Sequence, residues 1–420
     1  MSPLRLFLPL FLSAATGFAA NWPAWRGPQA DGVTPETNLP VKWSATENVK
    51  WKIDLPERGN STPIVWGDRI FLTQAVGQRR TVMCLDRKDG HLLWQEGPTW
   101  GDQFERTHPT NPACSGSPVT DGERVVAWFG SAGLYAWDLA GKELWHVDLG
   151  RQDHLWGYGS SPMISGDVCY LNFGPGVRSF VVAVDKRTGK ELWRFDVPPQ
   201  AIKEGPGGGN PDFTGSWTTP AMMKIGGRDQ LVVALPGAVY GLDPANGQEL
   251  WHCNGLNALA YAQPLQVDGM VLGFGGYSGF SIAAKVGGSG DLTANDRVWQ
   301  EKRSPQRIGS GVVVHDHVYM GSDAGIVQCI DTKTGQPLWE ERPQVPGGRA
   351  SSWSSIVRSG DRFYLTTKTS DTLVFRVEPK FELLSVNSLN DGMTNASLAA
   401  SNGDLFIRTH AHLWCIGAAK

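Results

Sequence analysis

The segment AVDKRTGKELW, residues Ala183–Trp193, decides the fold of this chain because it recurs along the sequence with its chemistry kept. In this frame a small residue ends a strand, Asp and Gly make a tight turn, and Trp opens the next strand. A Trp so placed can lie flat against a neighbouring module. Four further copies are CLDRKDGHLLW at Cys84–Trp94, AWDLAGKELW at Ala136–Trp145, GLDPANGQELW at Gly241–Trp251 and CIDTKTGQPLW at Cys329–Trp339.

The spacing of these copies indicates stacked modules of several strands each. The aspartates at the Asp position of the repeat are Asp86, Asp138, Asp185, Asp243 and Asp331, and they lie 52, 47, 58 and 88 residues apart. The last interval is about two periods of the roughly 40–50 residues that one propeller blade takes. A worn copy of the repeat, residues 284–299, falls inside it. The period therefore predicts the blades of a β-propeller.

A second repeat gives the number of blades. Each blade is expected to open with small residues, often Pro, followed by a strand, a short turn and an apolar strand. The eight openings begin at Ser61, Ser115, Ser160, Thr218, Ala262, Ser310, Ser354 and Asn395. The last blade has a third strand at His412–Ile416 but no fourth, whereas VKWKIDL at Val49–Leu55 is a strand without a blade, with Trp51 at the Trp position.

These patterns predict an all-β chain that forms one eight-bladed propeller of four-stranded antiparallel blades. The propeller spans residues 49–420, a lead-in of residues 21–48 precedes it, and the N-terminal strand closes the ring. Such closure removes an exposed sheet edge.

The full match of Ala183–Trp193 to the tryptophan-docking motif AxDxxTGxxxW resembles the quinoprotein-type propellers. The chain is most similar to exported proteins with PQQ-binding-like propeller repeats, which often begin with a segment like NWPAWRGPQADG at Asn21–Gly32. It resembles the propeller lipoprotein of outer-membrane assembly more distantly. The resemblance covers nearly all of the expected mature chain and implies the fold, while the motif describes blade packing and not a site.

The first twenty residues predict a cleavable signal peptide. Arg5 gives a weakly positive start, Leu6–Leu12 is apolar, and Gly17–Ala19 offers a cleavage site, so that the mature chain would begin near Asn21. No later stretch approaches the ~20 apolar residues of a membrane span. No cysteine follows the apolar run, so we expect no lipid anchor. We expect an exported, monomeric protein, periplasmic or secreted.

Composition and cysteine usage narrow the partners. A net charge of −3 over 420 residues argues against nucleic acid, whose phosphates need a basic surface. Cys84, Cys329 and Cys415 occupy the small-residue position of the repeat, so they are predicted to be buried small hydrophobes in separate blades. The pairing of three other cysteines stays open: Cys114, Cys169 and Cys253.

The resemblance implies one enzymatic function, a PQQ-dependent dehydrogenase that holds pyrroloquinoline quinone and Ca²⁺ near the axis. Alcohol dehydrogenases of that type carry a disulfide between adjacent cysteines, and Glu, Asn and Asp ligands for the cation. This chain has no adjacent cysteines and no blade-entry loop with such a cluster. Pairs such as His315/His317 and His410/His412 fall in turns and supply too few ligands for a metal site. We therefore expect no catalytic residue, metal or resident cofactor, with PQQ and Ca²⁺ as the alternative.

Candidate ligand-binding residues come from the blade openings, because the residues just before the first strand of a blade face the channel. Large aromatics with polar neighbours at that place can hold a flat or sugar-like ligand, although they can also simply plug the channel. Counting three residues back from the opening Pro, or its equivalent, gives Asn60, Ser115, Gly159, Trp217, Tyr261, Gly309, Trp353 and Asn395, of which Asn60, Trp217, Tyr261, Trp353 and Asn395 are the candidates.

Two loops supply a candidate surface for a protein partner, since Trp, Tyr and Arg are enriched in interfaces. Loop packing is the alternative reading. Arg307 and Arg408, each near a strand end, are weaker candidates, with a simple surface charge as the alternative interpretation. The sequence thus favours a non-catalytic scaffold for a protein, a small molecule or a glycan, with the quinoprotein oxidoreductase as the alternative. The candidate partner-binding residues are Trp100, Arg106, His108, His154, Trp156 and Tyr158.

Overall fold

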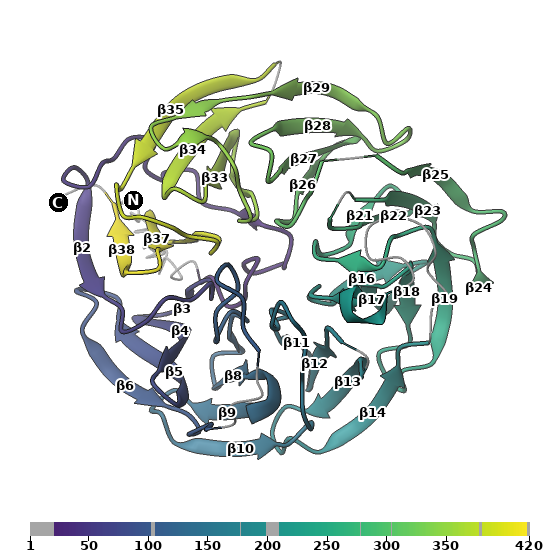
Figure 1. The fold of residues 1–420 in the computed structure, drawn as a ribbon, viewed down its shortest axis with the longest axis horizontal. Coiled ribbons are helices and arrows are strands. Elements are labelled where there is room, and N and C mark those ends of the chain that lie inside the picture. The colour runs from purple at the N-terminus through teal and green to yellow at the C-terminus, as the bar shows by residue number, and fades with distance from the viewer. Residues whose placement is uncertain are drawn as a thin grey trace, which may run out of the picture.

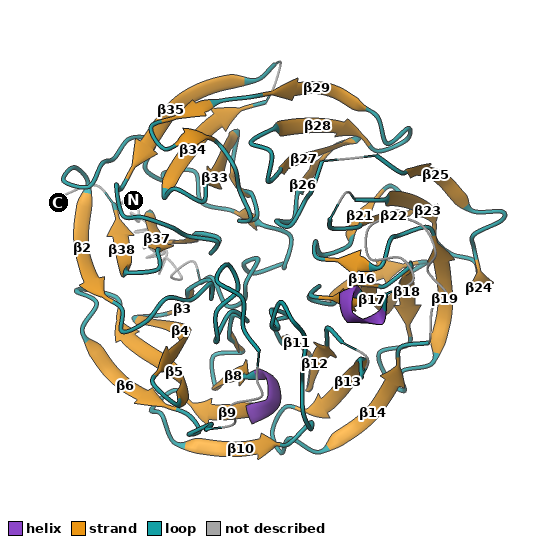
Figure 2. Ribbon diagram, in the orientation of Figure 1, coloured by secondary structure: helices purple, strands orange, loops and turns teal. Residues whose placement is uncertain are grey.

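The structure is a computed structural model that describes residues 21–101, 106–176, 178–198, 210–277, 279–303, 305–377 and 380–417. The predicted signal peptide, residues 1–20, and the glycine run at 205–209 lie outside these residues. The described chain forms a ring of eight radial β-sheets around a central axis (Figure 1). Nearly all of its regular structure is strand, with two short 3-10 turns, η1 at Gly130–Ala132 and η2 at Pro211–Phe213 (Figure 2).

Seven blades are formed by consecutive strands that pair antiparallel, so the predicted all-β, eight-bladed architecture is confirmed. Two of the blades carry a short additional parallel strand, β24 (Gly290–Asp291) on blade 4 and β1 (Val33–Thr34) on blade 7. Blades are numbered in chain order. Blade 1 is β3 Ile64–Trp66, β4 Arg69–Val76, β5 Arg79–Asp86 and β6 Leu92–Glu96; blade 2 is β7 Val119–Thr120, β8 Arg124–Trp128, β9 Leu134–Asp138 and β10 Glu143–Val147; blade 3 is β11 Met163–Ser165, β12 Val168–Phe173, β13 Phe180–Asp185 and β14 Glu191–Asp196; blade 4 is β16 Ala221–Ile225, β17 Arg228–Leu235, β18 Ala238–Leu242 and β19 Glu249–Asn254; blade 5 is β21 Leu265–Val267, β22 Met270–Phe274, β23 Ser281–Lys285 and β25 Arg297–Glu301; blade 6 is β26 Val312–Val314, β27 His317–Gly321, β28 Val327–Asp331 and β29 Pro337–Glu341; blade 7 is β32 Val357–Ser359, β33 Arg362–Thr366, β34 Asp371–Arg376 and β35 Glu382–Ser388. Outside the blades lie the parallel pair β15 Gly215–Ser216 and β20 Leu259–Ala260, and the hairpin β30 Gln344–Val345 and β31 Gly348–Arg349.

The eighth blade joins the two ends of the described chain, as predicted. Its inner strands are β36 (Ala399–Ser401), β37 (Asp404–Arg408) and β38 (His412–Ile416), and its outer strand is β2 (Val49–Asp54), antiparallel to β38. The register places Trp51 opposite Cys415. In Figure 1 the purple β2 lies at the rim beside the yellow strands, so β2 covers the edge that β38 would otherwise expose at the seam.

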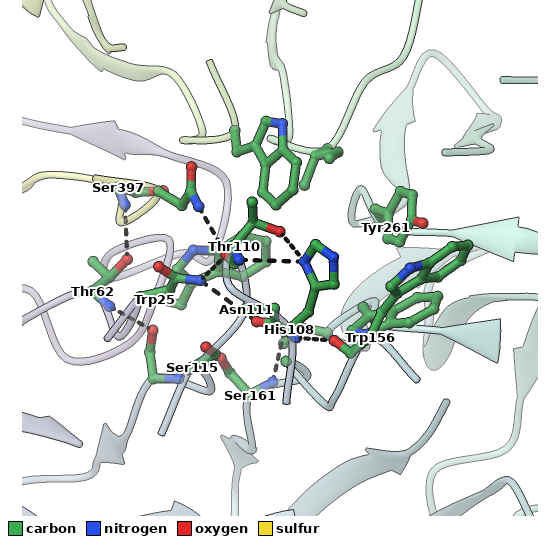
Figure 3. A pocket seen from close by; sticks show the side chains of 18 of the residues that line it. Trp25, Thr62, His108, Thr110, Asn111, Ser115, Trp156, Ser161, Tyr261 and Ser397 are labelled. Carbon is green, nitrogen blue, oxygen red and sulfur yellow. Dashed lines mark hydrogen bonds between the residues drawn. The ribbon is translucent and has the colours of Figure 1, made fainter. Parts of the chain in front are cut away.

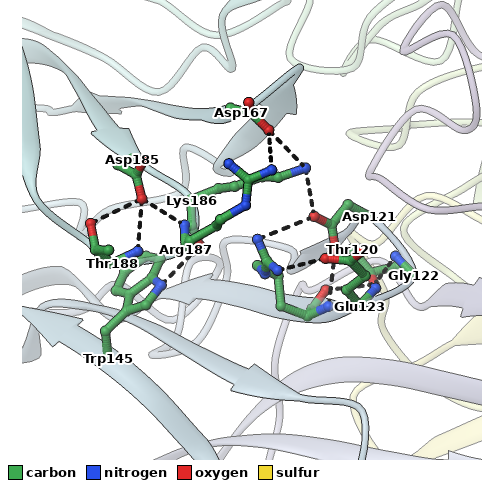
Figure 4. A network of polar contacts seen from close by, with 11 residues as sticks. Thr120, Asp121, Gly122, Glu123, Trp145, Asp167, Asp185, Lys186, Arg187 and Thr188 are labelled. Atoms are coloured by element: carbon green, nitrogen blue, oxygen red, sulfur yellow. Dashed lines mark hydrogen bonds and ion pairs between the residues drawn. The ribbon is translucent and has the colours of Figure 1, made fainter.

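The repeated motif works as a latch between neighbouring blades. In blade 2, the indole Nε1 of Trp145 donates a hydrogen bond of 2.9 Å to the carbonyl of Lys186 in the turn of blade 3 (Figure 4). Gly189 of that turn has φ +73°, and a Cβ added there would come within 2.7 Å of the Trp145 ring. Glycine is therefore required both by the turn and by the ring beneath it.

The same latch recurs around the ring. Indole groups of Trp94, Trp193 and Trp299 donate to turn carbonyls of the next blade at 2.8–3.0 Å, and Trp51 does so from blade 8 to blade 1. The worn repeat is thus a functional latch through Trp299. A buried Trp that is also hydrogen-bonded contributes several kcal/mol (about 3–5 when it is truncated to Ala), which explains why this segment repeats.

A girdle of hydroxyl groups joins the blades close to the axis. In each pair, a backbone N–H of one blade donates to the side-chain oxygen of the next, at 2.9–3.1 Å. The chain of bonds runs in one sense and is interrupted between blades 4 and 5, where Gln263 replaces the hydroxyl residue. The girdle residues are Thr62, Ser117, Ser161, Thr219, Ser310, Ser355 and Ser397.

The lead-in crosses the axis at the far ends of the innermost strands. Trp22 exchanges backbone hydrogen bonds with Val65 of blade 1, and β1 pairs with β32 of blade 7. Between them the buried Arg26 donates to the carbonyls of Ser310 and Gly311 in blade 6. The purple segment in the middle of Figure 1 is this crossing.

Two sequence interpretations concern buried residues. The six cysteines are all free and buried, so the predicted burial of Cys84, Cys329 and Cys415 is confirmed. The interpretation of Arg307 and Arg408 as surface charges is wrong: their side chains are 5 % and 0 % exposed, because acceptors from distant segments surround each guanidinium. In the described part of the chain, no helix has the length and apolar character that crossing a bilayer requires.

Candidate functional site

A cavity of about 400 Å³ lies on the axis of the ring. This volume is within the range of about 300–1,000 Å³ that is typical of small-molecule sites. All five candidate ligand-binding residues predicted from the blade openings line it: Asn60, Trp217, Tyr261, Trp353 and Asn395. In blade 6 the counting was off by one residue, since Ile308 and not Gly309 lines the cavity. The reason is that Gly311 stands where other blades have the opening Pro, one residue before Val312.

One wall of the cavity is aromatic. Trp217 lies with its ring centroid 4.8 Å from that of Tyr261 and 6.1 Å from that of Trp156. Its indole Nε1 donates to the carbonyl of Gly157 at 3.0 Å, and the buried ring of His154 packs edge-on against it at 5.0 Å. These contacts fix the orientation of the Trp217 ring before any ligand binds.

A second aromatic residue faces the cavity from blade 7. The Trp353 Nε1 donates to Oδ1 of Asp323 at 2.5 Å, and the ammonium group of Lys368 lies 4.9 Å from the Trp353 ring centroid. Lys368 also donates to Asp323 Oδ1 at 3.0 Å. Asp323, which the sequence analysis did not single out, is the only acidic residue among the described residues of the cavity lining.

A loop between blades 1 and 2 covers part of the cavity. The side-chain amides of Asn60 and Asn395 both donate to the carbonyl of Thr110 at 2.9 Å. The amide of Asn111 donates to the carbonyls of Trp156 and Tyr158 at 2.7 and 2.9 Å. Two predicted candidates, Asn60 and Asn395, thus position this loop while lining the cavity.

The predicted partner-binding residues separate into three groups. His108 and Trp156 line the cavity, as Figure 3 shows. His154 and Tyr158 are buried, and Tyr158 packs against Trp128 with ring centroids 5.0 Å apart. Trp100 and Arg106 are absent from the described lining; Arg106 is exposed and forms an ion pair of 3.5 Å with Asp153.

The lead-in and the girdle form the other end of the cavity. Trp25 lines it from the lead-in, together with the girdle hydroxyls of Thr62, Ser117, Ser161, Thr219 and Ser397. Sequence reasoning missed these residues, although the girdle hydroxyls of blades 1 to 4 come directly before the opening Pro.

Two histidines beside the cavity are held neutral. Burial lowers the pKa of His154 and His410 to about 4. An unfolded chain has histidines that titrate near about 6.5, so between pH 6.5 and 4 the unfolded state binds protons that the folded state does not. Stability is therefore expected to fall as the pH drops through this window.

We expect the urea midpoint of the wild type to decrease more between pH 7 and pH 4.5 than that of a His154→Gln, His410→Gln double variant. Glutamine stays neutral over this pH range and is compatible with burial, so the double variant has no titrating group at these two sites and loses this part of the pH dependence. His91→Gln, at an exposed histidine, is the matched control and should keep the wild-type slope. Equal slopes in all three proteins would contradict the prediction.

The lining was compared with what PQQ and Ca²⁺ would need. PQQ is a flat quinone with several carboxylates, and buried carboxylates need cationic partners. No arginine or lysine is among the described residues that line the cavity. Ca²⁺ takes about 6–8 oxygen ligands, often from carboxylates, whereas the described lining offers Asp323, already paired with Lys368. The described residues therefore do not fit this cofactor.

Elsewhere in the described chain, Asp86, Asp89 and His91 gather their ligand atoms within 4.8 Å of one another. Asp89 and His91 are exposed, and Asp86 caps the turn of blade 1 by accepting from the N–H of Lys88 at 2.7 Å. This cluster belongs to the turn of the latch.

The repeats of this chain also match a known protein family. The model of the outer membrane protein assembly factor BamB family, built on PQQ-type repeats, matches residues 33–173, 79–341 and 177–418. This chain belongs to that family. Like the latch motif, the family assignment describes the ring of blades. The solved structure of BamB from Moraxella catarrhalis shares this fold, with a TM-score of 0.59 at 15 % identity, over 87 % of this chain and 96 % of that one.

This chain is also similar in sequence to quinohemoprotein dehydrogenases. It is 32 % identical over 209 residues to the quinohemoprotein alcohol dehydrogenase ADH-IIG of Pseudomonas putida, covering 45 % of this chain and 27 % of the relative. It is 26 % identical to the quinohemoprotein alcohol dehydrogenase of Comamonas testosteroni over 48 % of this chain and 34 % of that protein. The solved Comamonas enzyme has a TM-score of 0.64 at 13 % identity, covering 96 % of this chain and 81 % of the enzyme. The matched part spans about a third or less of these curated relatives, and the structural likeness concerns the fold.

Proposed function

We propose that the protein is an exported, non-catalytic propeller that binds an uncharged small molecule in its axial cavity. The observation that carries the proposal is the wall of fixed aromatic rings, Trp156, Trp217, Tyr261 and Trp353, around a cavity of about 400 Å³. Apolar walls with a few convergent polar groups are typical of small-molecule sites. The described lining supplies no cation for an acidic ligand.

Chemistry in the cavity lacks support. General acid–base catalysis needs a titratable group in reach of the substrate, and the histidine of the described lining, His108, has its Nδ1 hydrogen-bonded to the Thr110 hydroxyl at 2.7 Å. His154 lies behind the aromatic wall, and burial lowers its pKa to about 4. Asp323 is held by Trp353 and Lys368. The binding of a ligand without turnover is the function that these groups favour.

A quinoprotein-like oxidoreductase is the second candidate, and the identity of 32 % to a quinohemoprotein alcohol dehydrogenase favours it. A protein-binding scaffold is the third candidate, in keeping with the BamB-type family. Its candidate partner-binding residues outside the described cavity lining are the half-buried Trp100 and the exposed Arg106. Both differ from the proposal in what they bind.

Calorimetric titration of the chain from Asn21 with PQQ, with and without Ca²⁺, is expected to give no heat of binding. A screen of uncharged fragments by ligand-observed NMR is expected to give hits that are lost in Trp217→Ala, because that ring forms the centre of the aromatic wall. The matched control is Leu338→Ala at an outer strand, where the side chain is 55 % exposed. Calcium-dependent binding of PQQ at equal stoichiometry, lost in Trp217→Ala, would overturn the proposal in favour of the oxidoreductase.

A further inference from the structure

Several polar atoms around the cavity have no partner in the described protein. Oδ1 of Asp323 accepts hydrogen bonds from Trp353, Lys368 and Ser351, but its Oδ2 accepts none from the described residues. Oδ1 of Asn395, in a side chain that is 9 % exposed, is buried without a hydrogen bond. A buried acceptor without a partner costs about 1–3 kcal/mol, so Oδ1 of Asn395 favours a ligand that donates to it. The Asp323 side chain is 32 % exposed, and its Oδ2 can accept from water or from a ligand.

Further groups of both hydrogen-bonding kinds face the same space. The Nδ1 atom of His108 is hydrogen-bonded to the hydroxyl of Thr110 at 2.7 Å, which leaves Nε2 as the ring nitrogen that can contact a ligand (Figure 3). Tyr261 and Gln306 also line the cavity, and among the described residues their side-chain polar groups have no hydrogen-bond partner. Burial raises the pKa of Tyr261 far above its usual value, so its hydroxyl stays protonated and can both donate and accept.

The electrostatics of the lining disfavour an acidic occupant. Asp323 is the only acidic residue of the described lining, and Lys368 beside it partly neutralises its charge. An acidic ligand would lose its hydration without gaining a cation. A carboxylate with a free oxygen instead gives strong, charge-assisted hydrogen bonds to hydroxyl donors.

The cavity is also closed at one end. Trp25 lines it from the lead-in, which crosses the axis between Val65 and Arg358 at the far ends of the innermost strands. A long polymer therefore cannot thread the ring, whereas the end of a polymer or a short oligomer can enter.

We infer that the cavity binds the terminal units of a neutral glycan, with Asp323 as the specificity-determining acceptor of sugar hydroxyls and Trp353 and Trp217 as stacking surfaces. Sugar rings present apolar C–H faces together with many hydroxyl donors and acceptors, and this combination matches fixed aromatic rings among unpartnered polar atoms. The inference rests on the proposed function, because it names the ligand class of the same site.

The test applies the full chain from Asn21 to a glycan array of neutral and acidic oligosaccharides. Titrations with maltotriose, cellotriose, chitotriose, mannotriose and trigalacturonate follow, with tryptophan fluorescence and calorimetry as readouts. We expect binding to neutral glycans, with quenching of tryptophan emission and no binding of trigalacturonate. Asp323→Asn should weaken binding about tenfold or more, because it removes a charge-assisted acceptor while keeping the side chain's shape. Trp353→Ala should weaken it at least as much.

The controls separate a folding defect from loss of the site. Asp361→Asn removes a carboxylate from an exposed pair with Arg376 and should bind like the wild type. If Trp353→Ala unfolds, as judged by circular dichroism, the near-isosteric Asp323→Asn carries the test alone.

Several outcomes would overturn the inference, and they differ in what they say of the proposed function. An empty array, or glycan binding that is unchanged in Asp323→Asn and Trp353→Ala, contradicts the glycan as occupant; if uncharged fragments still bind and are lost in Trp217→Ala, the proposed function stands. If neither glycans nor fragments bind, both fail. Preferential binding of acidic glycans would also contradict the inference.

Discussion

Replacing Val49–Asp54 by a Gly-Ser segment of equal length should abolish the cooperative folding of the propeller. This change removes β2 and leaves β38 with unpaired backbone groups, and an exposed strand edge promotes aggregation. It also removes the Trp51 latch, whose indole donates to Arg87 of blade 1 at 3.0 Å. Truncating a fully buried Trp costs about 3–5 kcal/mol, and the partly buried Trp51 should cost somewhat less. Together with the lost strand, this is comparable to the whole stability of a domain, about 5–15 kcal/mol.

Circular dichroism during urea titration and size-exclusion chromatography measure the result. The matched control is the same Gly-Ser replacement at residues 344–349, the hairpin of β30 and β31, which has the same length but closes no blade. The control should keep a single unfolding transition. A variant in β2 that stays monomeric with the wild-type midpoint would show that blade 8 does not depend on the N-terminal strand.

The second large effect is expected for Arg408→Ala. The Arg408 guanidinium is fully buried and donates to the carbonyls of Ser61 and Thr73 and to Oε1 of Gln74, at 3.3, 2.9 and 2.6 Å. These bonds connect β37 of blade 8 with the first strands of blade 1. Truncation would leave three buried acceptors without donors, at about 1–3 kcal/mol each, so we expect a loss of about 3–5 kcal/mol.

Burial lowers the pKa of Arg408 to about 10, so the side chain is still charged at pH 7 and its hydrogen bonds are intact. Urea denaturation of Arg408→Ala and of Arg376→Ala measures the difference. Arg376 is a suitable control because it forms ion pairs with Asp361 and Glu382 on an exposed surface, where such pairs contribute about 0–1 kcal/mol. If both variants lose less than about 1 kcal/mol, Arg408 is not a structural connection at the seam.

The ring itself could be predicted from the sequence because its cause is local. Each copy of the motif holds one turn and one Trp within about ten residues, and its Trp bonds the turn of the next blade, so even the worn copy ending in Trp299 keeps the pattern. The closing strand was predictable for the same reason, since Trp51 marks it as a fourth strand. The residues around the axis followed from their distance to the opening Pro, and the one error, Gly309 for Ile308, arose where blade 6 has Gly311 in place of Pro.

The rest of the site depends on contacts between distant segments. Asp323 lies in an inter-strand turn of blade 6 and lines the cavity next to Trp353 of blade 7, to which it is hydrogen-bonded. Trp25 lines the cavity because the lead-in crosses the ring. No local pattern announces such contacts. Arg408 was misread for a similar reason: its acceptors lie more than three hundred residues away in the sequence.

The pairing of β2 with β38 also governs the order in which the molecule can assemble. β2 is among the first described strands along the chain and β38 is the last of them, so the seam can close only after both have been synthesised. Contacts of such long sequence separation slow folding, because the loop entropy must be lost before the contact forms. Seven blades can form in succession along the chain, while the eighth is the final step. A chain synthesised only as far as blade 7 therefore holds β2 without its partner β38, and the ring stays open at the seam.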